Sequence, residues 1–109
     1  MNQEIYERLR NISERLKREY NAEKVILFGS YARGEETIDS DIDSDVDILV
    51  IAPTKERMID RMASVSRIIR DLRNGLPISP IVLTSEEFRR KVEEGDAFIR
   101  TVVEEGVVL

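Results

Sequence analysis

Two short polar motifs, each beside an apolar run, contain the side chains of this sequence that could do chemistry. The first, Gly29-Ser30, follows the apolar residues 25–28. The second is a pair of aspartates, Asp45 and Asp47, which leads into the apolar residues 48–51. At a turn that opens a helix, backbone N–H groups, a hydroxyl and the helix dipole can bind phosphate oxygens. Side chains alternate along a strand, so both carboxylates should point to one face, where they can share a cation. A phosphate site that faces a metal site predicts a nucleotide-binding site.

The chemistry of this predicted site is restricted to oxygen ligands. The sequence contains no Cys and no His, which excludes thiolate and imidazole metal ligands as well as a histidine general base. Two carboxylates ~6 Å apart at an effective dielectric near 20 repel by about 3 kcal/mol, which favours a cation between them. Carboxylate oxygens suit Mg²⁺ or Mn²⁺. Any metal or acid–base chemistry must therefore come from Asp and Glu.

The Gly-Ser motif has other interpretations. A lone Gly-Ser pair is most often an ordinary turn in which Ser caps a helix. The spacing of Gly29 and Gly34 also matches a P-loop, but Glu35 stands where that motif needs Lys, so the P-loop interpretation fails. Arg33 either reaches a triphosphate or is a solvated or ion-paired side chain. Only the downstream aspartates favour the nucleotide interpretation.

The aspartate pair belongs to a longer acidic run. Aspartates occupy five alternate positions: Asp39, Asp41, Asp43, Asp45 and Asp47. An EF-hand loop would need Gly at its sixth position and Glu at its twelfth, and the run does not provide them. A solubilising acidic loop explains the earlier aspartates but not the last two, which lead directly into an apolar strand.

At these motifs the sequence resembles the minimal nucleotidyltransferases, the small members of the DNA polymerase β-like superfamily. The matching pieces are L-F-G-S-Y-A-R-G and S-D-V-D-I-L-V, in the order strand, Gly-Ser, helix, Asp-x-Asp strand. The resemblance implies an α/β (α+β) fold with a mixed β-sheet flanked by helices. It also implies that ATP or another nucleoside triphosphate binds with Mg²⁺, two ions being expected. Gly29, Ser30 and Arg33 would bind the nucleotide, and Asp45 and Asp47 would be the catalytic and metal-binding pair.

An alternative metal pair is Asp41 and Asp43. Ten residues separate Ser30 from Asp41, which is the usual spacing of the family that the sequence resembles. However, Asp43 as the second ligand would force Asp45 and Asp47 into the strand interior as uncompensated charges, at roughly several kcal/mol each. A four-residue insertion in an exposed loop costs well under about 1 kcal/mol. The register of the strand therefore favours the later pair.

The predicted third strand departs from the family pattern. Active members usually bring a third carboxylate there, in a pattern like V-D-V-V. Aligned through Thr84, this chain reads I-S-P-I-V-L-T, so that Ser79 occupies the position. Glu86 or Glu87 could substitute, although both fit better as helix-capping or solvent-facing residues. The departure leaves two hypotheses open, an active enzyme and a non-catalytic module that keeps the fold.

The remaining segments must position these residues. Apolar positions at steps of three and four predict helices over four segments: residues 2–20, 54–74, 85–94 and 96–105. Short apolar runs predict strands over 25–28, 48–51 and 77–83, and a short strand or docking segment over 107–109. Thr54 is expected to cap the second helix, and Thr84 to form a capping box with Glu87. Met58 and Met62 are expected to fill the core.

Length and composition predict one domain over residues 1–109, and the resemblance implies that it is a minimal nucleotidyltransferase domain. A hydrophobic content of 41% with 36% charged residues is typical of a compact folded protein. The net charge of −5 argues against a dedicated nucleic-acid binder. No apolar run approaches the ~20 residues that span a bilayer, and no signal-peptide pattern opens the chain, so we expect a cytoplasmic protein without a membrane partner.

So small a domain leaves no room for a separate acceptor-binding domain, and a partner protein must supply the acceptor. The resemblance implies an antitoxin paired with a helical HEPN-type protein, to which some family members transfer AMP. A homo-oligomer is also compatible with the sequence. The expected function is Mg²⁺-dependent transfer of a nucleoside monophosphate, AMP above all, from a triphosphate to a hydroxyl of the partner. The alternative is a non-catalytic nucleotide- or partner-binding module that masks a HEPN-type partner.

Overall fold

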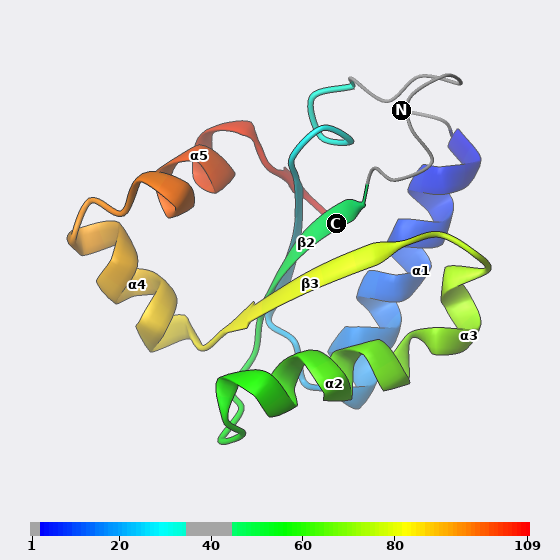
Figure 1. The fold of residues 1–109 in the computed structure, drawn as a ribbon, viewed down its shortest axis with the longest axis horizontal. Helices are drawn as coiled ribbons and strands as arrows, with labels where there is room; N and C mark the ends of the chain where they lie inside the picture. Colours follow the sequence, from blue (N-terminus) through cyan, green and yellow to red (C-terminus); the bar gives the residue numbers. More distant parts are fainter. Residues whose placement is uncertain (1–2, 35–44) are drawn as a thin grey trace.

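A four-stranded mixed sheet lies at the centre of the computed structural model, which describes residues 3–34 and 45–109 (Figure 1). The strands are β1 Lys24–Phe28, β2 Val46–Ile51, β3 Ile78–Leu83 and β4 Val107–Val108. Their spatial order is β3-β2-β1-β4. β2 and β3 are parallel, whereas β1 is antiparallel to both β2 and β4. The predicted mixed sheet and its short last strand are confirmed.

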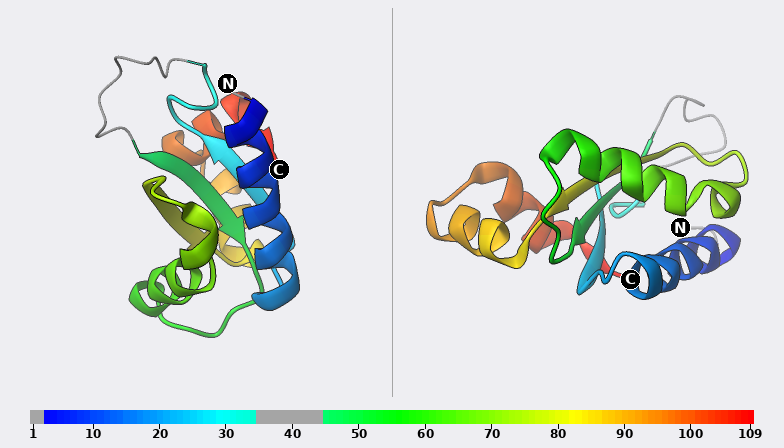
Figure 2. Two further views of the ribbon diagram at one scale, coloured as in Figure 1. Left: turned by 90° about the vertical axis from the view of Figure 1, so that its right-hand side faces the viewer. Right: turned by 90° about the horizontal axis from the view of Figure 1, so that it is seen from below.

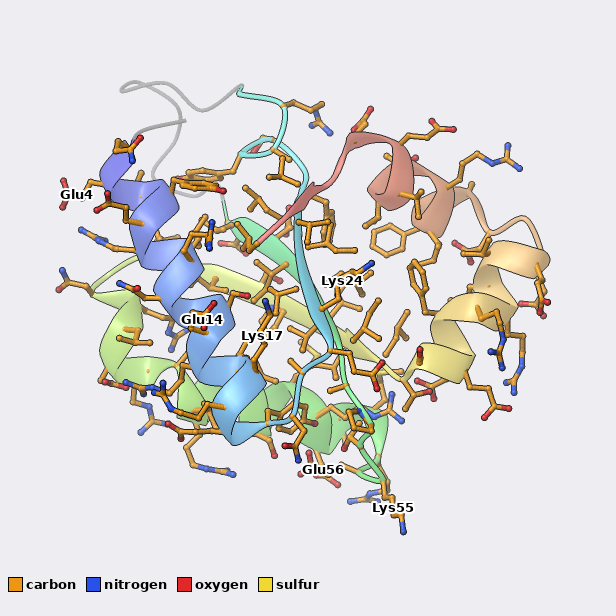
Figure 3. The ribbon with its side chains drawn as sticks, turned by 180° about the vertical axis from the view of Figure 1, so that it is seen from behind. Glu4, Glu14, Lys17, Lys24, Lys55 and Glu56 are labelled. Carbon is orange, nitrogen blue, oxygen red and sulfur yellow. The ribbon has the colours of Figure 1, made fainter. Side chains whose placement is uncertain are left out.

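Helices cover both faces of this sheet. They are α1 Gln3–Glu19, α2 Met58–Ile68, α3 Arg70–Arg73, α4 Ser85–Glu93 and α5 Ala97–Glu105. Helices α1, α2 and α3 pack on one face, and α4 and α5 on the other (Figure 2). On α1, Glu14 and Lys17 lie on the exposed side (Figure 3). Leu9, Ile12 and Leu16 of the same helix are buried. None of the helices in the described part of the chain is long and apolar enough to cross a membrane.

The alternation of side chains along β2 decides which face the candidate aspartates share. Val46, Ile48 and Val50 are buried in the larger core under α1 and α2. Leu49 and Ile51 belong to the smaller core under α4 and α5. Because neighbouring residues of a strand point to opposite faces, Asp47 lies on the face of the smaller core.

The helix expected over 54–74 begins later and is interrupted. Thr54 does not cap it, since its hydroxyl accepts a hydrogen bond from the Glu56 backbone N–H at 3.0 Å. α2 begins after Arg57, which makes no side-chain cap hydrogen bond. Ile69 then has φ −99° and ψ 6° and separates α2 from α3. The apolar periodicity continued across this break, so it could not predict the interruption.

The prediction that Met58 and Met62 fill the core is wrong. Their exposed fractions are 49% and 42%, whereas Arg61 between them is only 7% exposed. Arg61 can be buried because its guanidinium donates to Glu87 Oε1 at 2.7 Å and to the Val82 carbonyl at 3.2 Å. Satisfied hydrogen bonds and an opposite charge offset the cost of burying an ion. The helix therefore turns a charged side chain toward the sheet.

The capping box that opens α4 is confirmed. The Thr84 hydroxyl accepts from the Glu87 backbone N–H at 3.1 Å, and Glu87 Oε1 accepts from the Thr84 backbone N–H at 2.8 Å. The same carboxylate binds Arg61, and this hydrogen bond is the main reason why the pKa of Glu87 falls to about 2. Glu87 therefore joins α4 both to the end of β3 and to α2.

Candidate functional site

Gly29 and Ser30 form a tight turn at the end of β1. The Gly29 carbonyl accepts hydrogen bonds from the backbone N–H groups of Ala32 and Arg33, both at 3.1 Å. Gly29 and Gly34 have φ +77° and +70°, the left-handed conformation that Gly adopts at little cost. Residues 30–34 are turns, so the short helix expected after Gly-Ser is absent from this described stretch. The left-handed Gly34 does not allow the helical conformation to continue through it.

The carboxylate of Asp47 packs directly against this turn. Phe28 and Asp47 are paired in the antiparallel register of β1 and β2. A Cβ atom built on Gly29 would lie only 2.5 Å from Asp47 Oδ2, so any larger residue would displace the carboxylate. The glycine thus allows the backbone turn and the acidic side chain to occupy neighbouring positions. The two motifs that the sequence pairs are in contact.

Asp45 and Asp47 form the acidic side of the candidate site. Asp45 is exposed and Asp47 is half-buried. Burial raises the pKa of Asp47, the charge of Asp45 raises it further, and the positive charge of Arg33 lowers it. A cation bound at this pair would relieve the repulsion that the pKa reflects. The alternative pair, Asp41 and Asp43, lies outside the described residues.

Ser79 lies beside Asp47 in the sheet. The two residues are register partners in the parallel pairing of β2 and β3, so their side chains share a face. The two glutamates considered as substitutes belong to α4, beyond the other end of β3. Glu87 is engaged by Arg61, and Glu86 pairs with Arg90 at 3.2 Å. No group of three or more His, Cys, Asp or Glu side chains suited to a metal ion occurs within residues 3–34 and 45–109.

Arg33 and Glu105 form an ion pair beside the Gly-Ser turn. Arg33 Nη1 lies 3.2 Å from Glu105 Oε2, and the two side chains are 40% and 42% exposed. Glu105 ends α5 and is distant in sequence from both motifs, so no local pattern pointed to it. The apolar tail after Gly106 was the sequence feature that could have indicated this contact, because the tail pairs with β1 and brings the end of α5 back to the turn.

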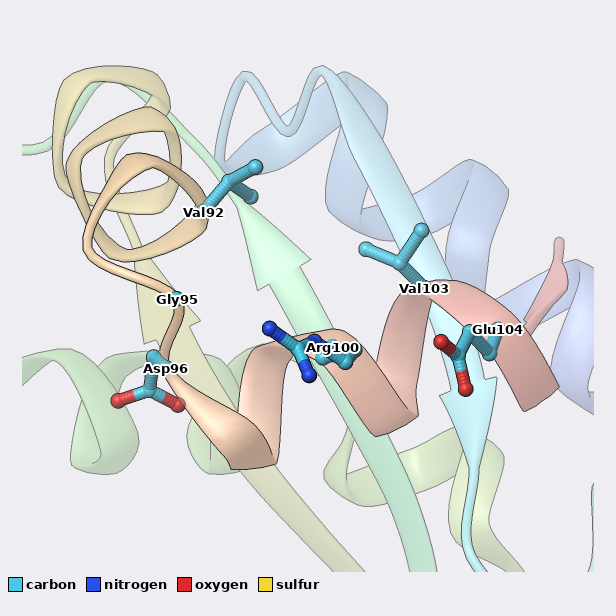
Figure 4. A pocket seen from close by; sticks show the side chains of 6 residues that line it. All are labelled: Val92, Gly95, Asp96, Arg100, Val103 and Glu104. Carbon is cyan, nitrogen blue, oxygen red and sulfur yellow. The ribbon is translucent and has the colours of Figure 1, made fainter.

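A separate cavity of about 160 Å³ lies between α4 and α5 (Figure 4). The residues that line it are Val92, Gly95, Asp96, Arg100, Val103 and Glu104. None of the nucleotide- or metal-binding residues expected from the sequence lies in this cavity. The candidate site lies instead around the Gly29 turn and the first residues of β2.

Residues 9–109 match the family described as Nucleotidyltransferase domain, and the chain belongs to this family. The solved structure of "a putative nucleotidyltransferase from Sulfolobus solfataricus" superposes with a TM-score of 0.60 at 28% sequence identity. That similarity covers 94% of this chain and 76% of the other chain, and it supports the fold class expected from the sequence.

Curated relatives come from Methanocaldococcus jannaschii. The chain is 39% identical over 97 residues to the "putative protein adenylyltransferase MJ0604", with 86% of each chain covered. It is 55% identical over 40 residues to the "putative protein adenylyltransferase MJ1379", which covers 37% of this chain and 40% of that protein.

Proposed function

We propose that this protein transfers AMP from ATP to a hydroxyl group of another protein. The observation that carries the proposal is the packing of the Asp47 carboxylate against Gly29, since a carboxylate beside a tight turn is the arrangement expected of a site for metal and phosphate. Membership of the nucleotidyltransferase family supports the reaction class. The relatives named as protein adenylyltransferases support AMP as the transferred group and a protein as the acceptor.

The acidic pair fits Mg²⁺. This ion is commonly bound by one or two carboxylates together with substrate phosphates and water. Asp45 and Asp47 would hold it, two ions being expected, and nucleotide phosphates would complete its ligands. When bound, Mg²⁺ neutralises the phosphate charge and the charge that develops on the leaving pyrophosphate.

The residues of the turn would orient the triphosphate. Gly29 and Ser30 bind the β- and γ-phosphates through the backbone and the hydroxyl, and Arg33 adds a positive charge nearby. The acceptor oxygen forms a bond to the α-phosphorus, the bond from that phosphorus to the β-phosphate oxygen breaks, and pyrophosphate leaves. The acceptor proton passes to water, because Ser79 stands where a carboxylate would take it. Positioning and electrostatics then account for most of the rate.

Calorimetry with ATP, with and without Mg²⁺, tests the binding step. We expect MgATP to stabilise the protein by about 2.7 kcal/mol at a hundred times the Kd, and metal-free ATP much less. Incubation with α-phosphate-labelled and γ-phosphate-labelled ATP tests the transfer, with the protein encoded by the neighbouring gene as the acceptor. Only the α label should appear on the acceptor. If no triphosphate gives a Mg²⁺-dependent shift, the nucleotide proposal is wrong.

A second candidate function is a non-catalytic module that binds nucleotide and masks a partner. The pairing of Ser79 with Asp47 favours it, since the position beside the acidic pair carries no charge. The expected partner remains a helical HEPN-type protein that forms an antitoxin pair with this chain. Mg²⁺-dependent ATP binding and a stable complex without label transfer would support this function over the enzyme.

A further inference from the structure

The end of α5 is fixed against β1 close to the Gly-Ser turn. Val107 pairs with Leu27 and Val108 with Ile26, and Glu105 at the end of α5 forms an ion pair with Arg33 of the turn that follows β1. Gly106 joins α5 to β4 at a point without room for a side chain. A Cβ atom there would collide with the Val102 carbonyl oxygen and would lie 2.5 Å from Ile26 Cγ2. The backbone before β4 therefore holds Glu105 at the rim of the candidate site.

Arg33 connects this carboxylate to the acidic pair. Its Nη1 atom donates to Glu105 Oε2 at 3.2 Å, and its charge is close enough to Asp47 to lower the pKa of that carboxyl. An Arg guanidinium has five N–H donors in a rigid fork, so one side chain can bind a carboxylate and a phosphate oxygen together. Glu105 can thus hold Arg33 without preventing its contact with a ligand.

We propose that Glu105 is a positioning residue that orients Arg33 toward the β- and γ-phosphates of the nucleotide, an inference that rests on the proposed function. A long Arg side chain loses rotamer freedom when it binds phosphate, and a partner that orders it beforehand reduces that loss. The charge of Glu105 itself acts in the opposite direction, because it repels a triphosphate. Glu105 contacts Arg33 at 3.2 Å, whereas the phosphates would lie on the far side of the guanidinium, where the repulsion is weaker and salt screens it more, so we expect the ordering of Arg33 to dominate.

Affinity for MgATP and MgAMP, measured by calorimetry, tests the proposal. We expect Glu105→Ala to weaken MgATP binding about two- to fivefold, the range of an exposed ion pair, and to leave MgAMP binding unchanged. Glu105→Gln should lie between this variant and the wild type, because its side-chain oxygen still accepts from Arg33. Glu104→Ala is the matched control, with the same charge change one residue away, and should bind like the wild type. Circular dichroism melts establish that each variant is folded.

A double-mutant cycle with Arg33→Ala separates positioning from simple charge. Glu105→Ala should have no further effect when Arg33 is already Ala. In a transfer assay the Glu105 variants should raise KM for ATP with little change in kcat. Tighter MgATP binding by Glu105→Ala, wild-type affinity, or an equal loss in both backgrounds would overturn the proposal. A wild-type protein that binds no MgATP would instead refute the proposed function, and this inference with it.

Discussion

Gly29 is the residue on which the geometry of the candidate site depends. We expect Gly29→Ala to abolish Mg²⁺-dependent ATP binding, since its Cβ atom would displace the Asp47 carboxylate. The left-handed conformation adds about 1–2 kcal/mol of destabilisation for a residue other than Gly. Gly34→Ala is the control, because Gly34 has a similar φ of +70° but, apart from Gly34 itself and its chain neighbours, no atom of residues 3–34 and 45–109 lies within 4 Å of a Cβ atom built there. Chemical denaturation compares the stability of the two variants, and nucleotide titration compares their affinity for MgATP. Equal losses of binding would contradict a specific role for the contact between Gly29 and Asp47.

The choice between the two candidate metal pairs is tested by paired substitutions. Asn at both Asp45 and Asp47 should abolish Mg²⁺-dependent nucleotide binding, because the half-buried Asp47 is the carboxylate that touches the turn. Ala at both Asp41 and Asp43 should leave binding nearly intact. Isothermal titration with MgATP distinguishes the pairs. The reverse pattern would show that spacing from Ser30, not strand register, determines the metal ligands.

Ser79 offers a test of catalysis apart from binding. Ser79→Asp would add a carboxylate in register with Asp47, where it could take the acceptor proton. Because general-base help is typically worth ~10²–10⁴-fold, we expect a slow transfer rate to rise clearly. In Ser79→Asn the new side chain is as large as Asp but carries no charge, so this variant should not raise the transfer rate. An unchanged rate in folded Ser79→Asp would favour the non-catalytic module.

Between the elements, the ion pair of Arg61 and Glu87 joins α2, β3 and α4. Glu87→Gln should reduce the free energy of unfolding by roughly 1.5–3 kcal/mol at neutral pH, because it leaves a buried Arg61 without its counter-charge. The exposed Glu86→Gln is the control and should change it by less than about 0.5 kcal/mol. The pKa of Glu87 is lowered in the folded state, so its contribution is present above the ordinary value of 4.5 and is lost as pH falls toward 2. Urea denaturation across this pH range should show the free energies of unfolding of the wild type and Glu87→Gln becoming equal in acid.

The edge strand β3 is protected against pairing with another chain by two features. Pro80 in its middle has no N–H to donate, and the Val82 carbonyl already accepts from Arg61 at 3.2 Å. Edge strands with unpaired backbone groups tend to aggregate, and proline and charged side chains reduce that tendency. The buried Arg61 thus holds α2 against α4 through Glu87 and also binds a backbone carbonyl at the edge of the sheet.

At the scale of the whole molecule, the charged form of Asp47 in the candidate site lowers the free energy of unfolding. Burial and the charge of Asp45 raise the pKa of Asp47 in the folded state. Protonated Asp47 therefore favours folding, and the stability that it contributes is lost as pH rises above the ordinary pKa of 3.8. Asp47→Asn should therefore stabilise the metal-free protein at neutral pH. The gain should vanish in acid, where Asp47 is protonated. Thermal melts at several pH values measure it, and a neutral-pH melting temperature below that of the wild type would contradict the interpretation.

The order of the elements and the chemistry of the two motifs could be predicted from local patterns in the sequence. Helix and strand periods, the Thr84–Glu87 capping box and the polar residues beside apolar runs all depend on neighbours a few positions apart. The complementary chemistry of a phosphate-binding turn and a carboxylate pair also suggested that Gly29-Ser30 and the pair Asp45 and Asp47 belong to one site. The break at Ile69 and the exposure of the methionines could not be predicted, since the apolar period is the same for either outcome.

Which distant side chains meet was settled by the packing of the folded chain. The contact between Asp47 and Gly29 depends on the register of β1 and β2, and the placement of Ser79 depends on that of β2 and β3. The burial of Arg61 depends on Glu87 from another helix. Glu105 reaches Arg33 only because β4 pairs with β1 and returns the end of α5 to the turn. These contacts join residues far apart in the chain, and their energy comes from packing and charge pairing that no local sequence pattern encodes.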